Sequence, residues 1–215
     1  MEWVTTQTPD VLEAVRGVRN AVADTALPVD VATEARAIVN QLDDYVLPRL
    51  ANLDAPLLAV IGGSTGSGKS TLVNALLRER VSHPGVIRPT TRQPVLVANP
   101  GDADWFNSPQ VLPGLARSHG AGDEQSTTLR VVETHRIPEG LALLDAPDFD
   151  SIDDQNRALA SQLLAAADLW IFVTTPARYA DQLVWNFLND AAGRGIEVAV
   201  VLNRLDDKAA ETVPD

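Results

Sequence analysis

The sequence predicts an α/β fold in which a mainly parallel sheet carries helices on both faces and is preceded by an N-terminal helical hairpin. Short continuous apolar runs such as Leu57–Ile61 are typical of strands that are buried on both faces. These runs alternate with stretches of helical periodicity, an order that produces crossover connections between parallel strands. A glycine-rich turn, Gly62–Gly68, joins the first apolar run to the helix after it. These three observations define the fold class.

Two amphipathic helices are expected before the first strand. The first opens at Pro9-Asp10, repeats apolar residues at steps of three and four as far as Val22, and is ended by Pro28. The second runs from about Asp30 to Leu47. Each helix has one apolar stripe and a polar back, so the two should pair with each other or dock on the α/β part of the chain. We therefore divide the chain into a helical segment, residues 1–54, and an α/β domain, residues 55–215.

The rest of the chain continues the alternation of strands and helices. Asn99–Gln125 is rich in Gly, Pro and Asp, which predicts a long surface insertion in which Trp105 and Phe106 pack as a small cluster. Arg178 follows a strand end, where it could approach a phosphate or a partner subunit, but a solvated loop arginine is the expectation. The further strands are expected at Pro94–Ala98, Leu129–Thr134, Leu141–Leu144, Trp170–Thr174 and Val198–Leu202, and the further helices at Asp153–Ala167 and Ala180–Ala192.

Composition excludes several functions. The 215 residues, 45% of them hydrophobic, suffice for one sizeable core. A net charge of −12 argues against a nucleic-acid partner, because such a partner needs a basic face. The chain has no cysteine, which removes disulfides and thiolate sites, and no two of its three histidines have helix spacing for a zinc site. The sequence has no apolar run long enough to cross a membrane and no secretory signal, so we expect a cytoplasmic location.

A phosphate-binding motif comes directly after the first strand. Residues 63–70 match G-x-x-x-x-G-K-S/T at every fixed position and lie between a strand and a helix, as the mechanism requires. Glycines let backbone N–H groups turn toward phosphate oxygens, and the helix N-terminus adds partial positive charge. Lys69, one of only two lysines, is expected to reach the β- and γ-phosphates, and Ser70 to ligate Mg²⁺. The expected nucleotide-binding residues here are Gly63, Ser64, Thr65, Gly66, Ser67, Gly68, Lys69, Ser70 and Thr71.

Two later strands end in residues that suit a nucleotide site. Leu141–Asp145 is an apolar strand that ends in a carboxylate, the pattern that holds Mg²⁺ in phosphate-loop proteins. The last strand runs into Asn203-Arg204-Leu205-Asp206, which resembles the N/T-K-x-D guanine motif of GTPases. On that resemblance Asn203 contacts the base edge and the stem of Arg204 covers the base. Asp206 would accept from guanine and reject adenine, which would leave its carboxylate unpaired.

A third segment, Arg88–Val97, lies where GTPases keep the switch threonine that closes on Mg²⁺ and the γ-phosphate. Its T-R-x-P followed by apolar residues resembles the dynamin-like GTPases. On that alignment Thr91 is the switch threonine, both a metal ligand and a catalytic residue, and Thr90 is the fallback.

Together these motifs resemble the translation-factor-related GTPases, on the Era-like and dynamin-like side, over about Pro56 to Asp207. The sequence looks most like the bacterial forms with a helical segment before the G domain, and its arginine-for-lysine bias suits an actinobacterial genome. The resemblance implies the three-layer P-loop NTPase fold, with GTP or GDP and Mg²⁺ as ligands. It also implies a homodimer that forms through the nucleotide face. The G domain is expected to be truncated at Asp215, and C-terminal sequence beyond it would supply a membrane or helical-bundle partner and membrane association.

The segment after the Mg²⁺ strand departs from the family pattern D-x-P-G, because it reads Asp145-Ala146-Pro147-Asp148. A carboxylate ~4 Å from phosphate costs about 4 kcal/mol per unit charge at an effective dielectric near ~20. The Asp148 side chain is therefore expected to point away, contact Mg²⁺ or be protonated. A sharper hypothesis makes Asp148 catalytic, as the residue that positions the attacking water. Phe149 stands where other GTPases keep a water-orienting glutamine, which predicts slow hydrolysis that dimerisation or a partner stimulates.

Three other functions remain open on the residues alone. Asp148 and Phe149 also suit a non-hydrolysing pseudo-GTPase that signals by nucleotide occupancy. An ABC-type ATPase shares the phosphate-loop motif, but the chain has no L-S-G-G-Q-like signature, and Ala146 stands where that class keeps its catalytic glutamate. A small-molecule kinase would need an arginine-rich lid, which is not visible. Phosphate release under saturating GTP separates a pseudo-GTPase from an enzyme, and competition between GTP and ATP tests the ABC-type alternative.

Overall fold

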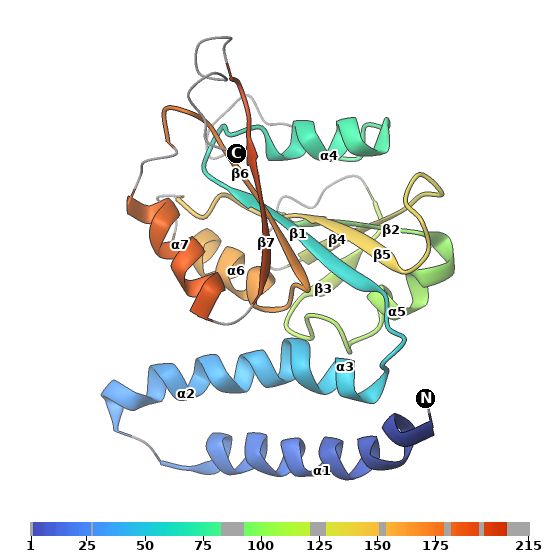
Figure 1. Ribbon diagram of the computed structural model, residues 1–215, viewed down its shortest axis with the longest axis vertical. Helices are drawn as coiled ribbons and strands as arrows, with labels where there is room; N and C mark the ends of the chain where they lie inside the picture. The colour runs from blue at the N-terminus through green and yellow to red at the C-terminus, as the bar shows by residue number, and fades with distance from the viewer. Residues whose placement is uncertain are drawn as a thin grey trace.

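A sheet of seven strands forms the middle of the molecule, in the order β3-β4-β2-β5-β1-β6-β7 (Figure 1). The computed structural model describes residues 2–26, 28–82, 93–120, 128–150, 154–178, 182–193 and 196–205. Neighbouring strands run parallel except β2 and β5, which confirms the mainly parallel sheet. The strands are β1 (Leu57–Gly63), β2 (Val95–Ala98), β3 (Ala116–Ser118), β4 (Thr128–Glu133), β5 (Leu141–Asp145), β6 (Leu169–Thr174) and β7 (Glu197–Leu202).

Helices cover both faces of this sheet, as the apolar runs predict (Figure 1). Along β1, Leu58 and Val60 enter the core that also contains α5, α6 and α7 residues, whereas Ala59 and Ile61 enter the core beneath α4. Because both faces of β1 are buried, its sequence is a continuous apolar run rather than an alternating one. These helices are α4 (Lys69–Leu77), α5 (Ala103–Asn107), α6 (Asp154–Ala165) and α7 (Gln182–Gly193).

Residues 99–120 are not the surface insertion that their composition predicts. They form a 3₁₀ turn, η2 (Pro100–Asp102), followed by α5 and β3. Phe106 is fully buried in the main core rather than in a small separate cluster, and Trp105 packs partly buried against that core. The Arg117 side chain donates to the backbone carbonyls of Phe106 at 2.8 Å and Ser108 at 3.1 Å, which fixes the path of the segment. Residues 121–125 lie outside the described residues.

The N-terminal hairpin is confirmed, but its first helix begins at Glu2 and not at Pro9-Asp10. Helix α1 (Glu2–Asp24) lies beside α2 (Val29–Gln41), which continues through a π-helical turn, η1 (Leu42–Val46), into α3 (Leu47–Ala51) (Figure 1). Arg19 of α1 donates to Asp43 of η1 at 2.6 Å and so ties the two arms together. No helix within the described ranges has both the length and the apolar character that crossing a membrane requires.

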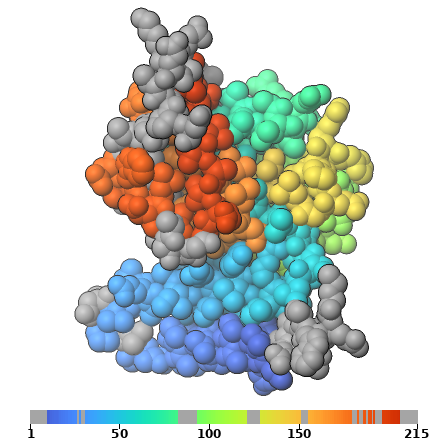
Figure 2. Space-filling model, viewed as in Figure 1, coloured from blue at the N-terminus to red at the C-terminus, as the bar shows by residue number. Residues whose placement is uncertain are grey.

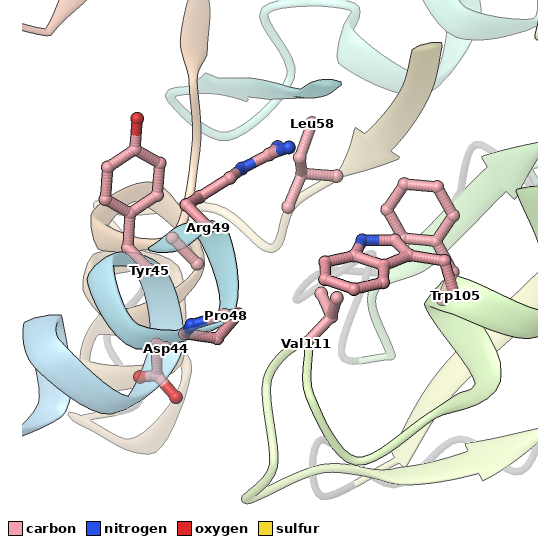
Figure 3. Close-up of a pocket in the computed structure, with 9 residues that line it drawn as sticks. Asp44, Tyr45, Pro48, Arg49, Leu58, Trp105 and Val111 are labelled. Carbon is pink, nitrogen blue, oxygen red and sulfur yellow. The ribbon is translucent and has the colours of Figure 1, made fainter. Parts of the chain in front are cut away.

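The helical segment packs as a layer against the α/β domain, where Figure 2 shows it in blue. Arg49 of α3 pairs with Asp168, whose carboxylate also accepts from the Leu58 backbone N–H at 2.6 Å. Figure 3 shows Arg49 extending toward Leu58, with Trp105 across the pocket between the two parts. That pocket has a volume of about 10 Å³, which leaves room for no more than a water molecule. The junction is therefore a packed contact and not a ligand site.

Candidate functional site

The candidate site lies at the edge of the sheet where four neighbouring parallel strands end. Strands β5, β1, β6 and β7 run side by side in one direction, so their carboxyl ends share one edge. Such edges are where ligands bind in open α/β sheets. The loop after β1, the segment after β5, the loop after β6 and Asn203 after β7 therefore converge, as the sequence predicts.

The phosphate loop, Gly63–Ser70, depends on glycine at two points of close approach. Gly63 has φ +155°, and a Cβ there would lie 2.1 Å from the backbone oxygen of Val173. Gly68 has φ +101°, and a Cβ there would lie 2.3 Å from Asn203 Nδ2. Helix α4 begins directly afterwards at Lys69. The chain therefore places a tight backbone turn on a helix N-terminus, an arrangement that binds anions.

Lys69 is held inside the loop and pairs with Asp148. The Lys69 ammonium donates to the backbone oxygens of Gly63 at 2.9 Å and Ser64 at 3.1 Å, and to the Asp148 carboxylate. Lys69 is only 5% exposed and Asp148 only 4%. How the Asp148 side chain lies toward a bound phosphate or Mg²⁺ stays a prediction. A buried ammonium needs a counter-charge, and Asp148 supplies it.

Asp145, the expected metal ligand, is fully buried at the end of β5. Ser82 Oγ donates to its Oδ2 at 2.6 Å, while Oδ1 has no hydrogen-bond partner. Burial raises the pKa of Asp145 above its ordinary value, and the hydroxyls of Ser70 and Ser82 oppose that shift. A buried carboxylate oxygen without a partner, close to a serine hydroxyl, is the hard oxygen donor set that Mg²⁺ prefers. The residues present therefore fit that ion.

Ser82 was not found by sequence reasoning, although its position is strongly fixed. The Asn74 side chain accepts from the Val81 and Ser82 backbone N–H groups, both at 2.9 Å, and donates to the Ser82 carbonyl at 2.7 Å. A serine that comes after a helix gives no sequence signal of this kind. It is the side chain of Asn74 that places the Ser82 hydroxyl on Asp145.

Further buried polar atoms gather at the same edge. Within the described part of the chain, the hydroxyl oxygens of Ser64, Ser67 and Thr174 are buried and have no hydrogen-bond partner. Buried polar atoms normally have partners, so three such hydroxyls around one loop indicate a ligand with many polar atoms. A nucleotide polyphosphate fits that description.

Asp150 contacts the phosphate loop at a second point. Its carboxylate accepts from the Thr65 backbone N–H at 2.7 Å and from Thr65 Oγ1 at 2.8 Å. Arg178, in the loop after β6, donates to the other Asp150 oxygen at 2.6 Å. The Arg178 side chain is 41% exposed in its loop, as expected, and its guanidinium is also paired with Asp150. The contact of Asp150 with Thr65 joins residues 85 positions apart, so no local sequence pattern indicates it.

Asn203 ties the end of β7 to the phosphate loop. Its backbone N–H donates to the Thr174 carbonyl and its Nδ2 to the Ser67 carbonyl, both at 2.8 Å. Arg204 comes next with φ +60° and is exposed. Asp206, Thr90 and Thr91 lie outside the described residues, so their guanine and switch roles stay predictions.

A family model described as 50S ribosome-binding GTPase matches residues 58–204, which include the phosphate loop, Asp145 and Asn203. The chain belongs to this GTPase family. The match confirms the family that the motifs indicate. The chain is 24% identical over 191 residues to the "probable transmembrane GTPase FZO-like, chloroplastic" of Arabidopsis thaliana, covering 83% of this chain and 18% of the plant protein.

Solved structures similar to this chain include two kinds of protein. One is a bacterial dynamin from an oligomerised pair that senses and tethers membranes, with 14% identity and a TM-score of 0.47, covering 98% of this chain and 34% of that one. Another is Aquifex aeolicus Era bound to GDP and AlF4⁻, with 18% identity and a TM-score of 0.41, covering 72% of this chain and 42% of that one. The chain spans about a fifth of the plant relative and a third of the dynamin.

Proposed function

We propose that this chain binds GTP and GDP with Mg²⁺ at the carboxyl edge of the sheet and hydrolyses GTP to GDP and phosphate. The observation that carries the proposal is the meeting of the phosphate loop with Asp145, whose buried Oδ1 has no partner. Membership of a GTPase family supports it independently. Among the alternatives, the ABC-type and kinase readings lose support, because that family match spans most of the α/β domain.

Each expected site residue has a role in this proposal. The phosphate-loop backbone and Lys69 would bind the phosphate oxygens, and Ser70, Asp145 and Thr91 would hold Mg²⁺. When bound, the ion neutralises charge on the β- and γ-phosphate oxygens. Asn203, Arg204 and Asp206 would select guanine. The set of nucleotide-binding residues otherwise stays as the sequence predicts it, from Gly63 to Thr71.

Hydrolysis is proposed to be slow in the isolated chain. Phe149 is buried and its ring packs against Phe172 with the centroids 5.5 Å apart, so this position offers no polar side chain to orient a water. Asp148 could position the water only after leaving Lys69. We therefore propose that a second copy, meeting the nucleotide face, or another partner stimulates the reaction. A membrane or helical-bundle partner beyond this chain, and a cytoplasmic or membrane-associated location, likewise remain proposals from the resemblance.

Binding and turnover test the proposal separately. Calorimetric titration with GTP, GDP and ATP in Mg²⁺ is expected to give binding for the guanine nucleotides only, and Lys69→Ala is expected to abolish it. Single-turnover phosphate release, measured at low and high protein concentration, is expected to be slow and to rise with concentration. ATP binding as tight as GTP binding would contradict guanine selection. Tight GTP binding with no phosphate release at any concentration would favour the occupancy-signalling alternative, which the Lys69–Asp148 pair also suits.

A further inference from the structure

The segment after β5 places a carboxylate on the lysine that the γ-phosphate would use. We propose that Asp148 competes with the γ-phosphate for Lys69 and thereby sets the preference of the site for GDP over GTP. The inference rests on the proposed function, since it names what distinguishes the two nucleotides at that site.

The first step is the saturation of Lys69. An ammonium group has three N–H donors, and the structure gives Lys69 three acceptors: two backbone oxygens of the phosphate loop and the Asp148 carboxylate. A further anion can therefore bind Lys69 only by replacing one of them. The two backbone oxygens are neutral acceptors and the Asp148 carboxylate is charged, so a first phosphate group replaces a backbone oxygen and a second must replace Asp148.

The second step is that the pair is buried and of full opposite charge. The two side chains are 5% and 6% exposed, so water screens them little. A charged hydrogen bond in such a place is strong and is lost only when another anion takes over the ammonium. GTP supplies that anion, and the pair resists its entry.

The third step concerns the rest of the segment. Two residues beyond Asp148, the Asp150 carboxylate holds Thr65 through its N–H and hydroxyl, and Arg178 holds Asp150 in turn. The segment is thus anchored on the phosphate loop at both ends of a short stretch. Because Asp150 holds the same segment on the phosphate loop, the Asp148 carboxylate is harder to displace from Lys69 than that of an unanchored segment would be.

The final step separates the two nucleotides. GDP and GTP both bring a β-phosphate, which takes the N–H held by a backbone oxygen, whereas only GTP brings a γ-phosphate, which needs the N–H that Asp148 holds. The γ-phosphate of GTP would bring further negative charge to the same ammonium, where like charges repel. GTP binding must therefore break the Lys69–Asp148 pair, whereas GDP binding need not. Asp148 accordingly determines specificity between the nucleotides.

Dissociation constants for Mg²⁺-GTP and Mg²⁺-GDP test this directly, by calorimetry on wild type, Asp148→Asn and Asp148→Gly. Both variants remove the charge, and the ratio of the GTP constant to the GDP constant is expected to fall at least about tenfold. Asp104→Asn is the matched control, because Asp104 is an exposed carboxylate on α5 whose loss changes net charge equally. Its ratio is expected to equal that of wild type.

Asp148→Glu keeps the charge and is expected to keep the low GTP preference of wild type. Because removing one partner leaves Lys69 unpaired, Asp148→Asn is also expected to gain more thermal stability from GTP than wild type does. The Tm comparison tests the proposal even if Asp148→Asn folds poorly in the absence of nucleotide. A ratio unchanged in both neutral variants, in protein that binds both nucleotides, would overturn the inference alone. A wild-type chain that binds neither nucleotide would overturn the proposed function together with it.

Discussion

Replacing Gly63 by alanine would test whether the phosphate loop depends on backbone that only glycine adopts at low cost. Gly63 has φ +155°, and its added Cβ would lie 2.1 Å from the Val173 backbone oxygen. The strained φ costs about 1–3 kcal/mol. Relieving the overlap requires β1 and β6 to move apart, and such overpacking costs about 1–3 kcal/mol more. The expected loss is therefore about 2–6 kcal/mol of the roughly 5–15 kcal/mol that stabilises a typical domain.

Gly62→Ala provides the matched control one residue earlier. A Cβ on Gly62 would lie 3.5 Å from Leu164 Cδ2, an ordinary contact, and φ there is not in the left-handed region. This variant is expected to stay within about 1 kcal/mol of wild type. Urea unfolding followed by circular dichroism measures both variants, and calorimetry gives their GTP affinity. Equal midpoints and slopes for the two alanine variants would show that the Val173 contact imposes no constraint.

Three further outcomes are expected. Ser82→Ala removes a hydrogen bond of about 1–3 kcal/mol from Asp145 and should raise the Mg²⁺ concentration needed for GDP binding. Ser82→Thr, which keeps the hydroxyl, should stay close to wild type. An unchanged Mg²⁺ midpoint in Ser82→Ala would contradict this. Asn203→Ala loses the bond to the Ser67 carbonyl and should weaken GTP and GDP together by about tenfold in calorimetry; a change in GTP alone would refute the reasoning. Burial raises the pKa of Asp44 from 3.8 to about 6, so the favourable contribution of the protonated group is complete below pH 3.8 and is lost as pH rises through about 6. Asp44→Asn should therefore stabilise the protein by about 2 kcal/mol at pH 7 and by little at pH 4. Urea unfolding at the two pH values measures this, and the same difference at both would contradict the prediction.

The central strands and the loop edge could be predicted because their causes are local. Leu57–Ile61 reads as a buried strand from its own residues, and the spacing of Gly63, Gly68 and Lys69 defines the phosphate loop without reference to the rest of the chain. Parallel neighbours then bring Asp145 and Asn203 to the same edge, because strand direction alone determines where their ends meet. These features required no knowledge of how loops pack.

The partners of the acidic residues could not be predicted, because they depend on three loops meeting. The argument from repulsion between Asp148 and phosphate stays a prediction, and it leaves out the attraction between Asp148 and Lys69, which are 79 residues apart. The prediction of a surface insertion over residues 99–120 was wrong for another reason. Their Gly, Pro and Asp content predicts exposure, whereas Phe106 and its apolar neighbours bury the segment at irregular spacings that no periodicity shows.

The tie between Asn203 and the phosphate loop has a consequence for synthesis. The two bonded residues, Asn203 and Ser67, are separated by 136 positions. At roughly 5–20 residues per second, a ribosome makes Asn203 on the order of 7–27 s after Ser67. During that interval the nascent chain holds its phosphate loop without the last bond that fixes it. We therefore expect the phosphate loop to reach its final geometry late in translation, after β7 joins the sheet.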